Sequence, residues 1–503
     1  MGMSIRKHLL ANLLGRSSVL LLNFVTLPFY YQVLGPAAMG LIGINAAIVT
    51  LVSLLDVGLP TALNRNMSIL YSTNKNDQMA SNLRSFETIF IATSGGVLLF
   101  SGLLSNLMVE YWITSVDLPH SEILMSLDLM LMAAALRFLV SIYQASLYGL
   151  HQQVAVNWLV FCSASFRFVA PLVFFLYGRQ TVVVFFWFQL IAVVCEFAIL
   201  FFLNWKCVGW GHFLCKPSLT VLRKSLSFSL GVTGISISAA LLSQLDKIIL
   251  AKLLDLSQFG YYAIAFSLSA GIVSLAYPVT NAAFPHLTAS TSRNDVQRAH
   301  SNFEFFYQAL VGLLLPLCIF GCIHAPHLMT LYLGDEGAGF VWPLFATLVV
   351  GSFFAGLTSL PHVALLSTGN WKPPFILNML SVPIYAFSIF LAASVGAGTV
   401  AFAYLIFQIF YFAAISLWAE NEIAEIVCGV LSKSLFDALI PLSSCILVGF
   451  LTLSLMDQGY GTIGLMGYSS AFLVWCYGSL MLSKNYRTLV MGFFKRVIAN
   501  EVR

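Results

Sequence analysis

A set of charged side chains lies inside apolar stretches that are long enough to cross a bilayer. Its basic members are Arg16, Arg137, Arg167 and Lys247, and its acidic members are Asp56, Glu196 and Asp246. Near a bilayer centre each such charge costs roughly 2.5–3.5 kcal/mol even on a lenient insertion scale, so it is retained where it faces a water-filled cavity or a partner. Surplus positive charge predicts an anionic ligand, and arginine suits phosphate because its planar fork makes two-point contacts.

Polar residues align along one helical face in four of these stretches, at 100° per residue. The faces comprise Asn12, Arg16, Asn23, Thr26 and Tyr30 in the first stretch, Asn45 and Asp56 in the second, Arg137, Ser141, Gln144 and Tyr148 in the fourth, and Ser229, Thr233, Ser236, Ser243 and Lys247 in the seventh. Three of the four faces carry a cation. They predict a polar, cationic lining to which several helices contribute.

The mid-span arginines and Arg16 also have structural explanations. Arg16 lies near enough to one end of its span for its long side chain to reach the membrane surface. Arg137 and Arg167 are mid-span, where that is hard, and one of them would instead pair with Glu196.

The remaining charges have similar alternatives. Asp56 precedes Val-Gly-Leu-Pro, a sequence that caps or kinks a helix. Asp246 and Lys247 are sequence neighbours that point about 100° apart on a helix, so we expect each to have a separate partner.

The composition identifies the protein class. Of 503 residues, 59% are hydrophobic and only 9% are charged, whereas a soluble globular protein carries about 25% charged residues. The chain is therefore predicted to be an all-α polytopic membrane protein. It has no basic runs that would indicate nucleic-acid binding. Its nine cysteines are scattered without a CxxC pair, so we expect no disulfide framework, metal site or cofactor.

About 20 apolar residues are needed for a membrane-spanning helix, and the chain contains fourteen such runs. The predicted spans are 9–33, 40–63, 86–109, 126–149, 155–177, 181–204, 226–252, 259–283, 305–331, 342–366, 375–394, 400–419, 437–456 and 462–482. The first run follows Arg6 and Lys7, but it is longer than the apolar core of a signal peptide and has no cleavage site after a short core, so we expect it to be retained.

Lysine and arginine accumulate on the cytoplasmic side of membrane proteins. If both termini are cytoplasmic, 18 of the 24 basic residues fall in cytoplasmic segments and Arg179 alone falls on the opposite side. The other five lie within spans: the four named above and Lys252, which is at the outer end of span 7. This asymmetry predicts an inner-membrane protein with both termini inside.

A faint internal repeat divides the spans. The stretches LGPAAMGLIGI (34–44) and LDLSQFGYYAI (254–264) match at Leu, Gly and Ile and lie 220 residues apart. We predict a six-helix bundle in residues 1–204, a cytoplasmic linker in 205–225, a second six-helix bundle in 226–419, and spans 13 and 14 with a basic cytoplasmic tail in 420–503. Repeated halves with a site between them are typical of alternating-access transporters.

Several stretches resemble the bacterial polysaccharide flippases of the Wzx type, within the multidrug/oligosaccharidyl-lipid/polysaccharide exporter superfamily. They are NFVTLPFYYQVLGPAAMGLIGI and LLDVGLPTALNR in spans 1 and 2, QLDKIILAKLLDLSQFGYYAIA across spans 7 and 8, and LLSTGNWKPP after span 10. The resemblance implies a MATE-like V of two six-helix bundles plus two C-terminal helices. It also implies ion-coupled movement of undecaprenyl-pyrophosphate-linked oligosaccharide repeat units, for example of O-antigen, from the cytoplasmic to the periplasmic leaflet.

On this resemblance we assign candidate roles. The residues assigned to the substrate are Arg16, Asn23, Arg137, Arg167 and Lys247, and those assigned to ion coupling or charge balance are Asp56, Glu196 and Asp246. The coupling ion would be H⁺ or Na⁺. The expected partners are the lipid-linked oligosaccharide, membrane lipids and other polysaccharide-assembly membrane proteins, and no nucleic acid.

Three other functions remain as alternatives. A flippase for lipid II or another lipid-linked precursor would also use a cationic cavity. A drug exporter of the MATE type typically needs a carboxylate in its first helix, where this chain has Arg16. A membrane glycan polymerase or ligase would place catalytic residues on a large outer loop, yet the longest outer loop spans only about 110–125. We therefore expect a transporter with no catalytic residues, not an enzyme.

Overall fold

The computed structural model describes residues 2–56, 58–73, 75–113, 117–213, 215–438, 471–472, 474–478 and 486. Within these residues the side chains of 2–21, 76, 212, 219, 221, 223–233 and 235–236 are not described. The Arg16 side chain, most of the predicted spans 13 and 14, and the basic tail therefore lie outside the described residues.

The described part of the chain is helical and contains no strand. Its helices are α1 (Gly2–Ser53), α2 (Leu59–Ser72), α3 (Asn76–Tyr111), α4 (His120–Gly149), α5 (Gln153–Phe175), α6 (Val182–Val208), α7 (Leu219–Leu253), α8 (Leu256–Thr291), α9 (Val296–Ile323), α10 (Ala325–Ser367), α11 (Lys372–Ala393), α12 (Ala397–Glu422) and α13 (Ala424–Val427), with short 3₁₀ turns η1 (Leu54–Asp56) and η2 (Trp210–His212). Ten helices of this part are long and apolar enough to cross a membrane. The predicted all-α membrane fold is confirmed.

Predicted spans 1 to 12 all fall on helices, but some of their limits are wrong. Span 2 is not continuous, because α1 ends at Ser53 and α2 begins at Leu59 after a turn in which Gly58 has φ 69°. Span 9 is also divided, since α9 ends at Ile323 and α10 begins at Ala325 with a proline in its first turn. Proline cannot donate to the preceding turn, so it starts a new helix instead of continuing the old one.

Two glycines break long helices in the same way. Gly35 interrupts α1 with φ 79° and ψ 176°, and Gly334 interrupts α10 with φ 80° and ψ 173°. Both follow a leucine, in Leu34-Gly35 and Leu333-Gly334. Glycine reaches positive φ without the penalty that a Cβ imposes, so each break replaces a loop between two spans.

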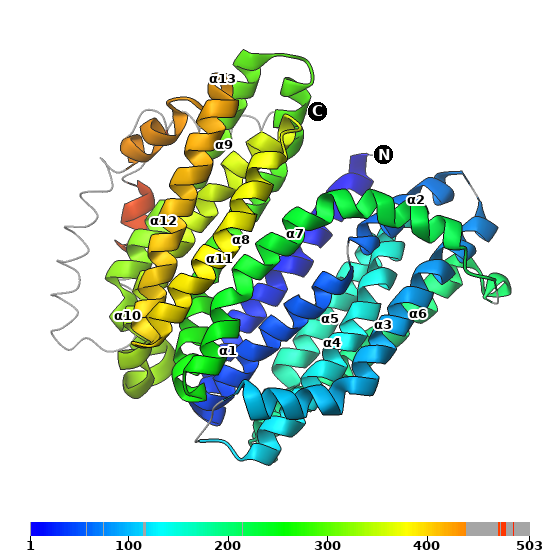
Figure 1. Cartoon of the computed structure of the whole chain (residues 1–503), viewed down its shortest axis with the longest axis horizontal. Helices are drawn as coiled ribbons and strands as arrows, with labels where there is room; N and C mark the ends of the chain where they lie inside the picture. Colours follow the sequence, from blue (N-terminus) through cyan, green and yellow to red (C-terminus); the bar gives the residue numbers. More distant parts are fainter. Residues whose placement is uncertain are drawn as a thin grey trace. The chain divides into compact units, whose positions relative to one another are not determined.

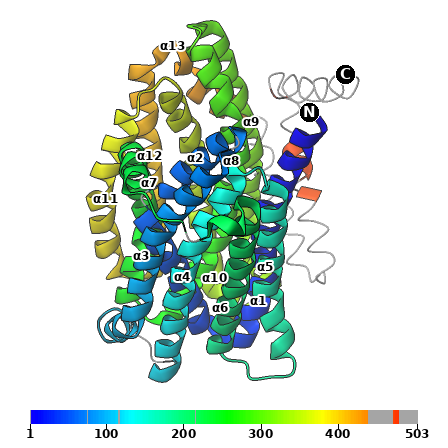
Figure 2. The ribbon, with the colours of Figure 1, turned by 90° about the vertical axis from the view of Figure 1, so that its right-hand side faces the viewer.

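The chain divides into two compact units, Met1–Gly260 and Tyr261–Arg503. In the first unit α4 is the central helix. In its apolar membrane-spanning stretch 67% of the residues are buried, and it packs against α1, α2, α3 and α6. Helices α3 to α6 run side by side in both views (Figures 1 and 2). In the second unit α10 is the central helix. In its apolar stretch 56% of the residues are buried, and α9 and α12 pack against it. The predicted bundle and linker boundaries stay predictions.

Gly40 and Gly260, which occupy matching positions of the predicted repeat, lie at the same helix crossing in the first unit. A Cβ on Gly260 would lie 1.9 Å from the Pro36 carbonyl oxygen and 3.1 Å from the Gly40 nitrogen. A Cβ on Gly40 would lie 2.4 Å from the Leu256 carbonyl oxygen. The first turn of α8 therefore crosses the second segment of α1 at backbone contact, which only glycine permits at these two positions.

This crossing predicts that Gly260→Ala destabilises the protein. The added methyl must displace backbone atoms, and such overpacking costs about 1–3 kcal/mol. The control is Gly271→Ala on the same helix, where a Cβ would have no neighbour within 4 Å and would gain up to about 1 kcal/mol of helix propensity. Thermal unfolding of the purified variants in detergent is the measurement. Equal melting temperatures for the two variants would contradict the close crossing.

Candidate functional site

The polar face predicted on α4 is directed at α5 and α6. Arg137 Nη2 donates to Gln189 Oε1 of α6 at 3.2 Å. One turn further, Ser141 is occupied by its own helix and bonds the carbonyl of Phe138. The central helix thus joins its neighbours through polar contacts as well as through apolar packing.

Gln189 joins the two mid-span arginines. While its Oε1 accepts from Arg137, its Nε2 donates to the backbone carbonyl of Arg167 on α5 at 3.3 Å. The two guanidinium groups lie near enough for their charges to interact. The Nε atoms of Arg137 and Arg167 are buried and have no acceptor among the described residues. Each arginine therefore retains a donor that no described protein group uses.

Glu196 on α6 is only 7% exposed and is held by neutral donors. Gln144 Nε2 of α4 donates to Oε1 at 2.9 Å, and Ser163 Oγ of α5 donates to Oε2 at 2.6 Å. Among the described residues no basic nitrogen lies within ion-pair distance of Glu196. The expected pairing of one arginine with Glu196 is therefore not a direct ion pair in the described structure.

These contacts define the α4–α5–α6 seam. Its members are Arg137, Gln144, Ser163, Arg167, Gln189 and Glu196. The seam contains two cations and one anion, and the anion accepts its hydrogen bonds from an amide and a hydroxyl. An anionic oxygen, such as one of a phosphate, is bound well by hydrogen-bond donors that carry a net positive charge.

Of the predicted residues of α1 and η1, those with described side chains form no printed contact with the α4–α5–α6 seam. Asn23 is half-buried on α1, and Tyr30, of the same predicted face, is 3% exposed and donates to the Phe168 carbonyl of α5 at 2.7 Å. Tyr30 therefore packs the bundle rather than lining a cavity. Asp56 Oδ1 accepts from the Gly58 backbone nitrogen at 2.9 Å, which is the capping explanation for this residue.

Asp246 and Lys247 on α7 bond to each other. Lys247 Nζ lies 3.2 Å from Asp246 Oδ1 and donates to the Ser243 carbonyl at 2.9 Å. Both side chains are buried, at 1% and 6% exposure. Their angular separation predicts separate partners, and each residue has a further contact. The four-carbon stem of lysine in addition folds back far enough to reach Asp246.

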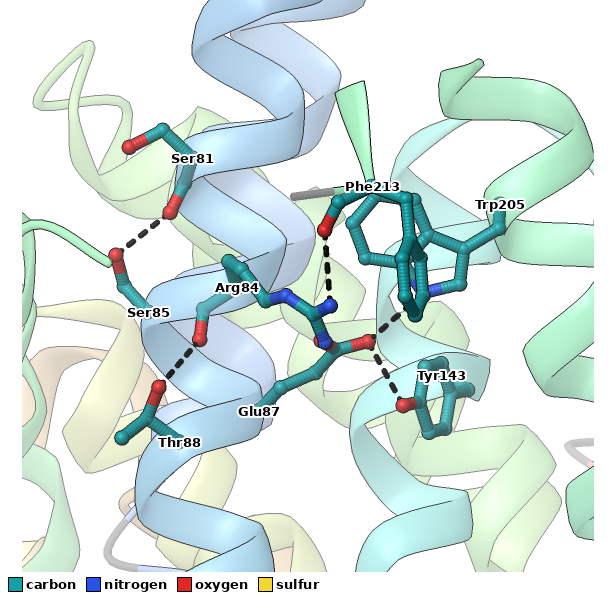
Figure 3. A network of polar contacts seen from close by, with 8 residues as sticks. All are labelled: Ser81, Arg84, Ser85, Glu87, Thr88, Tyr143, Trp205 and Phe213. Carbon is teal, nitrogen blue, oxygen red and sulfur yellow. Dashed lines mark hydrogen bonds and ion pairs between the residues drawn. The ribbon is translucent and has the colours of Figure 1, made fainter. Parts of the chain in front are cut away.

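A second buried carboxylate, Glu87 on α3, was not among the residues predicted from sequence. It is 0% exposed and accepts from Tyr143 Oη of α4 at 2.8 Å and from Trp205 Nε1 of α6 at 3.0 Å (Figure 3). Arg84 Nη1 pairs with its other oxygen at 2.7 Å. The carboxylate therefore connects three helices of the first unit.

Arg84 extends this network to the segment after α6. Its Nη2 donates to the Phe213 carbonyl at 2.8 Å, and its guanidinium lies over the Trp205 and Phe213 rings at 5.1 and 4.3 Å (Figure 3). Like Glu87, Arg84 is not among the residues predicted from sequence. The available signal was a glutamate three residues after an arginine at the start of an apolar run, which is the i, i+3 spacing of a helical ion pair.

In the described part of the chain, no three His, Cys, Asp or Glu side chains are close enough to hold a metal ion. The titratable groups of the site are instead distributed over helix seams, where they bond to amides, hydroxyls and aromatic side chains.

Comparison with known proteins gives a family match. The family described as polysaccharide biosynthesis protein matches residues 5–291. A protein of Shigella flexneri assigned as an O-antigen transporter is 22% identical over 399 residues, which are 78% of this chain and 92% of that protein.

Solved structures share the fold at low sequence identity. An inward-facing MATE family multidrug transporter of the MOP superfamily has a TM-score of 0.68 and 12% identity over 81% of this chain and 95% of its own. The lipid II flippase MurJ, in an inward closed conformation, has a TM-score of 0.67 and 14% identity over 96% and 99% of the two chains. A MOP superfamily transporter of Pyrococcus furiosus, whose binding pocket is described as having reverse polarity, has a TM-score of 0.56 and 16% identity over 84% and 96%.

The Glu87 network predicts a large effect of Glu87→Gln on stability. The substitution keeps the size of the side chain but replaces charge-assisted hydrogen bonds, which contribute about 1.5–3 kcal/mol each. The matched control is Glu304→Gln, because Glu304 pairs with Lys433 at 3.3 Å where both side chains are partly exposed, and such pairs contribute about 0–1 kcal/mol. Denaturant unfolding in detergent measures both. If Glu87→Gln lowers the free energy of unfolding no more than Glu304→Gln does, the Glu87 network does not stabilise the first unit.

Proposed function

Because the chain belongs to the polysaccharide biosynthesis protein family, we propose that it moves undecaprenyl-pyrophosphate-linked oligosaccharide repeat units from the cytoplasmic to the periplasmic leaflet. The chain is a multi-pass membrane transporter of the MOP superfamily with a Wzx-like, flippase-type fold. The finer proposal concerns its substrate, which has an anionic pyrophosphate, a polar glycan and a polyprenyl tail. We place the protein in the inner membrane with both termini cytoplasmic.

The observation that carries the proposal is the pair of arginines in the α4–α5–α6 seam. Arg137 and Arg167 share Gln189, each keeps a buried Nε without an acceptor in the described structure, and neither has a carboxylate at ion-pair distance there. A buried cation without a paired anion is costly. An anionic headgroup that reaches the seam would remove this cost, because a phosphate oxygen accepts charge-assisted bonds from guanidinium groups.

The amides and hydroxyls of the seam supply the second part of substrate recognition. Gln144, Ser163 and Gln189 bring two amides and a hydroxyl beside the arginines. Such groups exchange hydrogen bonds with sugar hydroxyls as readily as with one another. We further assign Arg16, Asn23 and Lys247 to substrate contact, and the acids Asp56, Glu196 and Asp246 to ion coupling or charge balance.

Alternating access through a cationic cavity, driven by a gradient of H⁺ or Na⁺, is the proposed mechanism. The faint internal repeat supports it, because repeated halves with a site between them are typical of alternating-access transporters. Other polysaccharide-assembly membrane proteins are the proposed partners, since they supply or consume the same lipid-linked substrate.

The test is thermal stability of the purified protein with and without a polyprenyl-pyrophosphate oligosaccharide. We expect the glycolipid to stabilise the wild type. Arg137→Gln and Arg167→Gln should each weaken its binding about ten- to hundredfold, because a charge-assisted hydrogen bond contributes about 1.5–3 kcal/mol. Arg179→Gln is the matched control, since Arg179 is exposed on the loop between α5 and α6.

Each outcome discriminates between functions. Stabilisation by lipid II but not by the oligosaccharide would indicate a lipid II-type flippase. Stabilisation by a cationic drug alone would indicate an exporter of the drug-transporting branch. If the glycolipid binds equally well to Arg137→Gln, Arg167→Gln and Arg179→Gln, and the melting temperatures of the free proteins are unchanged, the seam is not part of the substrate site.

A further inference from the structure

The second unit has a seam of three helices that the predicted repeat matches to the α4–α5–α6 seam of the first unit. Spans 4, 5 and 6 correspond to spans 10, 11 and 12, so α10, α11 and α12 are the counterparts of α4, α5 and α6. The charged residues of α10 after Gly334, and of α11 and α12, are confined to helix ends: Asp335, Glu336, Lys372, Glu420 and Glu422. Between these ends the three helices carry one histidine, His362. The arginines and the glutamate of the first seam have no charged counterpart here.

His362 is part of a hydrogen-bonded chain across all three helices. Its Nε2 lies 3.0 Å from Tyr411 Oη of α12, and Tyr411 donates to Asn378 Oδ1 of α11. Asn378 is 2% exposed. The chain therefore ties the central helix α10 to both of its partners through one side chain from each.

The hydrogen positions follow from counting donors. A tyrosine hydroxyl has a single hydrogen, and Tyr411 gives its hydrogen to Asn378. The bond between His362 and Tyr411 must then be donated by Nε2–H of the histidine. In the neutral ring this leaves Nδ1 as the nitrogen with a free lone pair.

The titratable and charged groups on the surrounding helices have other contacts. On α9, Glu304 accepts from Gln308 and Lys433, and Tyr307 stacks on Phe303. On α8, the His286 ring packs on Phe306 at 5.8 Å. None of these contacts includes His362, Tyr411 or Asn378.

On α11 and α12 the nearby phenols are packed by aromatic rings. Tyr385 stacks on Phe407 at 4.2 Å, and Phe407 packs against Tyr411. Tyr404 packs edge-on against Phe266. Within the described residues no carboxylate forms an ion pair with His362, so a proton at this position would add an uncompensated positive charge to the seam.

We propose that His362 is the proton-binding group of the second unit, through which a proton gradient drives transport. A hydronium ion of the surrounding water gives its proton to Nδ1: one O–H bond breaks, the Nδ1–H bond forms, water is released, and the seam changes from neutral to a charge of +1. The imidazolium is a stronger donor to Tyr411 and favours a hydrated or anion-facing position. Protonation therefore biases how α10 packs against α11 and α12. This inference rests on the proposed transport function and selects H⁺ over Na⁺, at a residue separate from Asp56, Glu196 and Asp246.

The first test needs no substrate. The full-length protein is labelled with ¹⁵N-histidine, and the His362 resonance is identified as the signal that His362→Gln removes from the nine histidines. We expect the neutral Nε2–H form at pH 8 and the doubly protonated ring at the acid end of a titration that runs from pH 8 to pH 4. Tyr411→Phe, which removes only the hydroxyl, should change the tautomer ratio. A ring that stays neutral throughout, or an Nδ1–H form at pH 8, would overturn the proposal.

The second test measures transport in proteoliposomes that contain a polyprenyl-pyrophosphate oligosaccharide. If one proton moves per cycle, a difference of one pH unit shifts the distribution of glycolipid between leaflets about tenfold. We expect this shift in the wild type and in the control His286→Gln, whose histidine is exposed in the same unit. His362→Gln and Tyr411→Phe should bind the glycolipid as the wild type does but shift less than about twofold.

The two tests fail separately. A full shift in His362→Gln, or a shift that follows a Na⁺ gradient instead, would overturn the role of His362 and leave the flippase intact. Absence of glycolipid binding and transport in the wild type would overturn the proposed function, while the titration would still decide whether His362 takes up a proton.

Discussion

Hydrocarbon offers no hydrogen-bond partners, so a polar group that this chain places in the membrane needs a partner in the protein, in a ligand or in water. The backbone meets this requirement with long helices, and even the connections at Gly35 and Gly334 are short breaks within a helix. The side chains meet it by forming contacts at helix seams. Glu87 shows the result most clearly, because one carboxylate without solvent exposure gathers Arg84, Tyr143 and Trp205 from three helices.

The two units satisfy their buried polar groups with different side chains. In the first unit, the seam of α4, α5 and α6 contains two arginines and a glutamate that is bonded to neutral donors. In the second unit, the equivalent helices are joined by a neutral chain of His362, Tyr411 and Asn378. A permanently charged seam suits recognition of an anion, whereas a seam with one titratable ring suits a change of charge with pH. On the proposed roles, helices that the predicted repeat makes equivalent would have two different tasks.

Packing at the helix crossing constrains where these seams lie. Gly260 and Gly40 bring the first turn of α8 onto α1 at backbone contact. Tyr30 fixes α1 to α5 through the Phe168 carbonyl and packs edge-on against Phe185 of α6. This polar residue of α1 therefore serves packing, and a polar helical face does not by itself mark a cavity.

The sequence by itself determined the membrane class, the approximate places of the apolar helices and the charges within them, because the energetic contrast between hydrocarbon and water is large and depends on residue type alone. It also indicated the family, through motifs in spans 1, 2, 7 and 8. It did not determine the breaks within the predicted spans 2 and 9. Only the tertiary structure decided which charges meet. Gln189 joins Arg137 to Arg167, Lys247 folds back to Asp246, Asp56 caps a helix break, and His362 reaches Tyr411. These contacts depend on helix rotation and side-chain reach within a few ångströms, and the spacing of residues along a single helix does not contain that information.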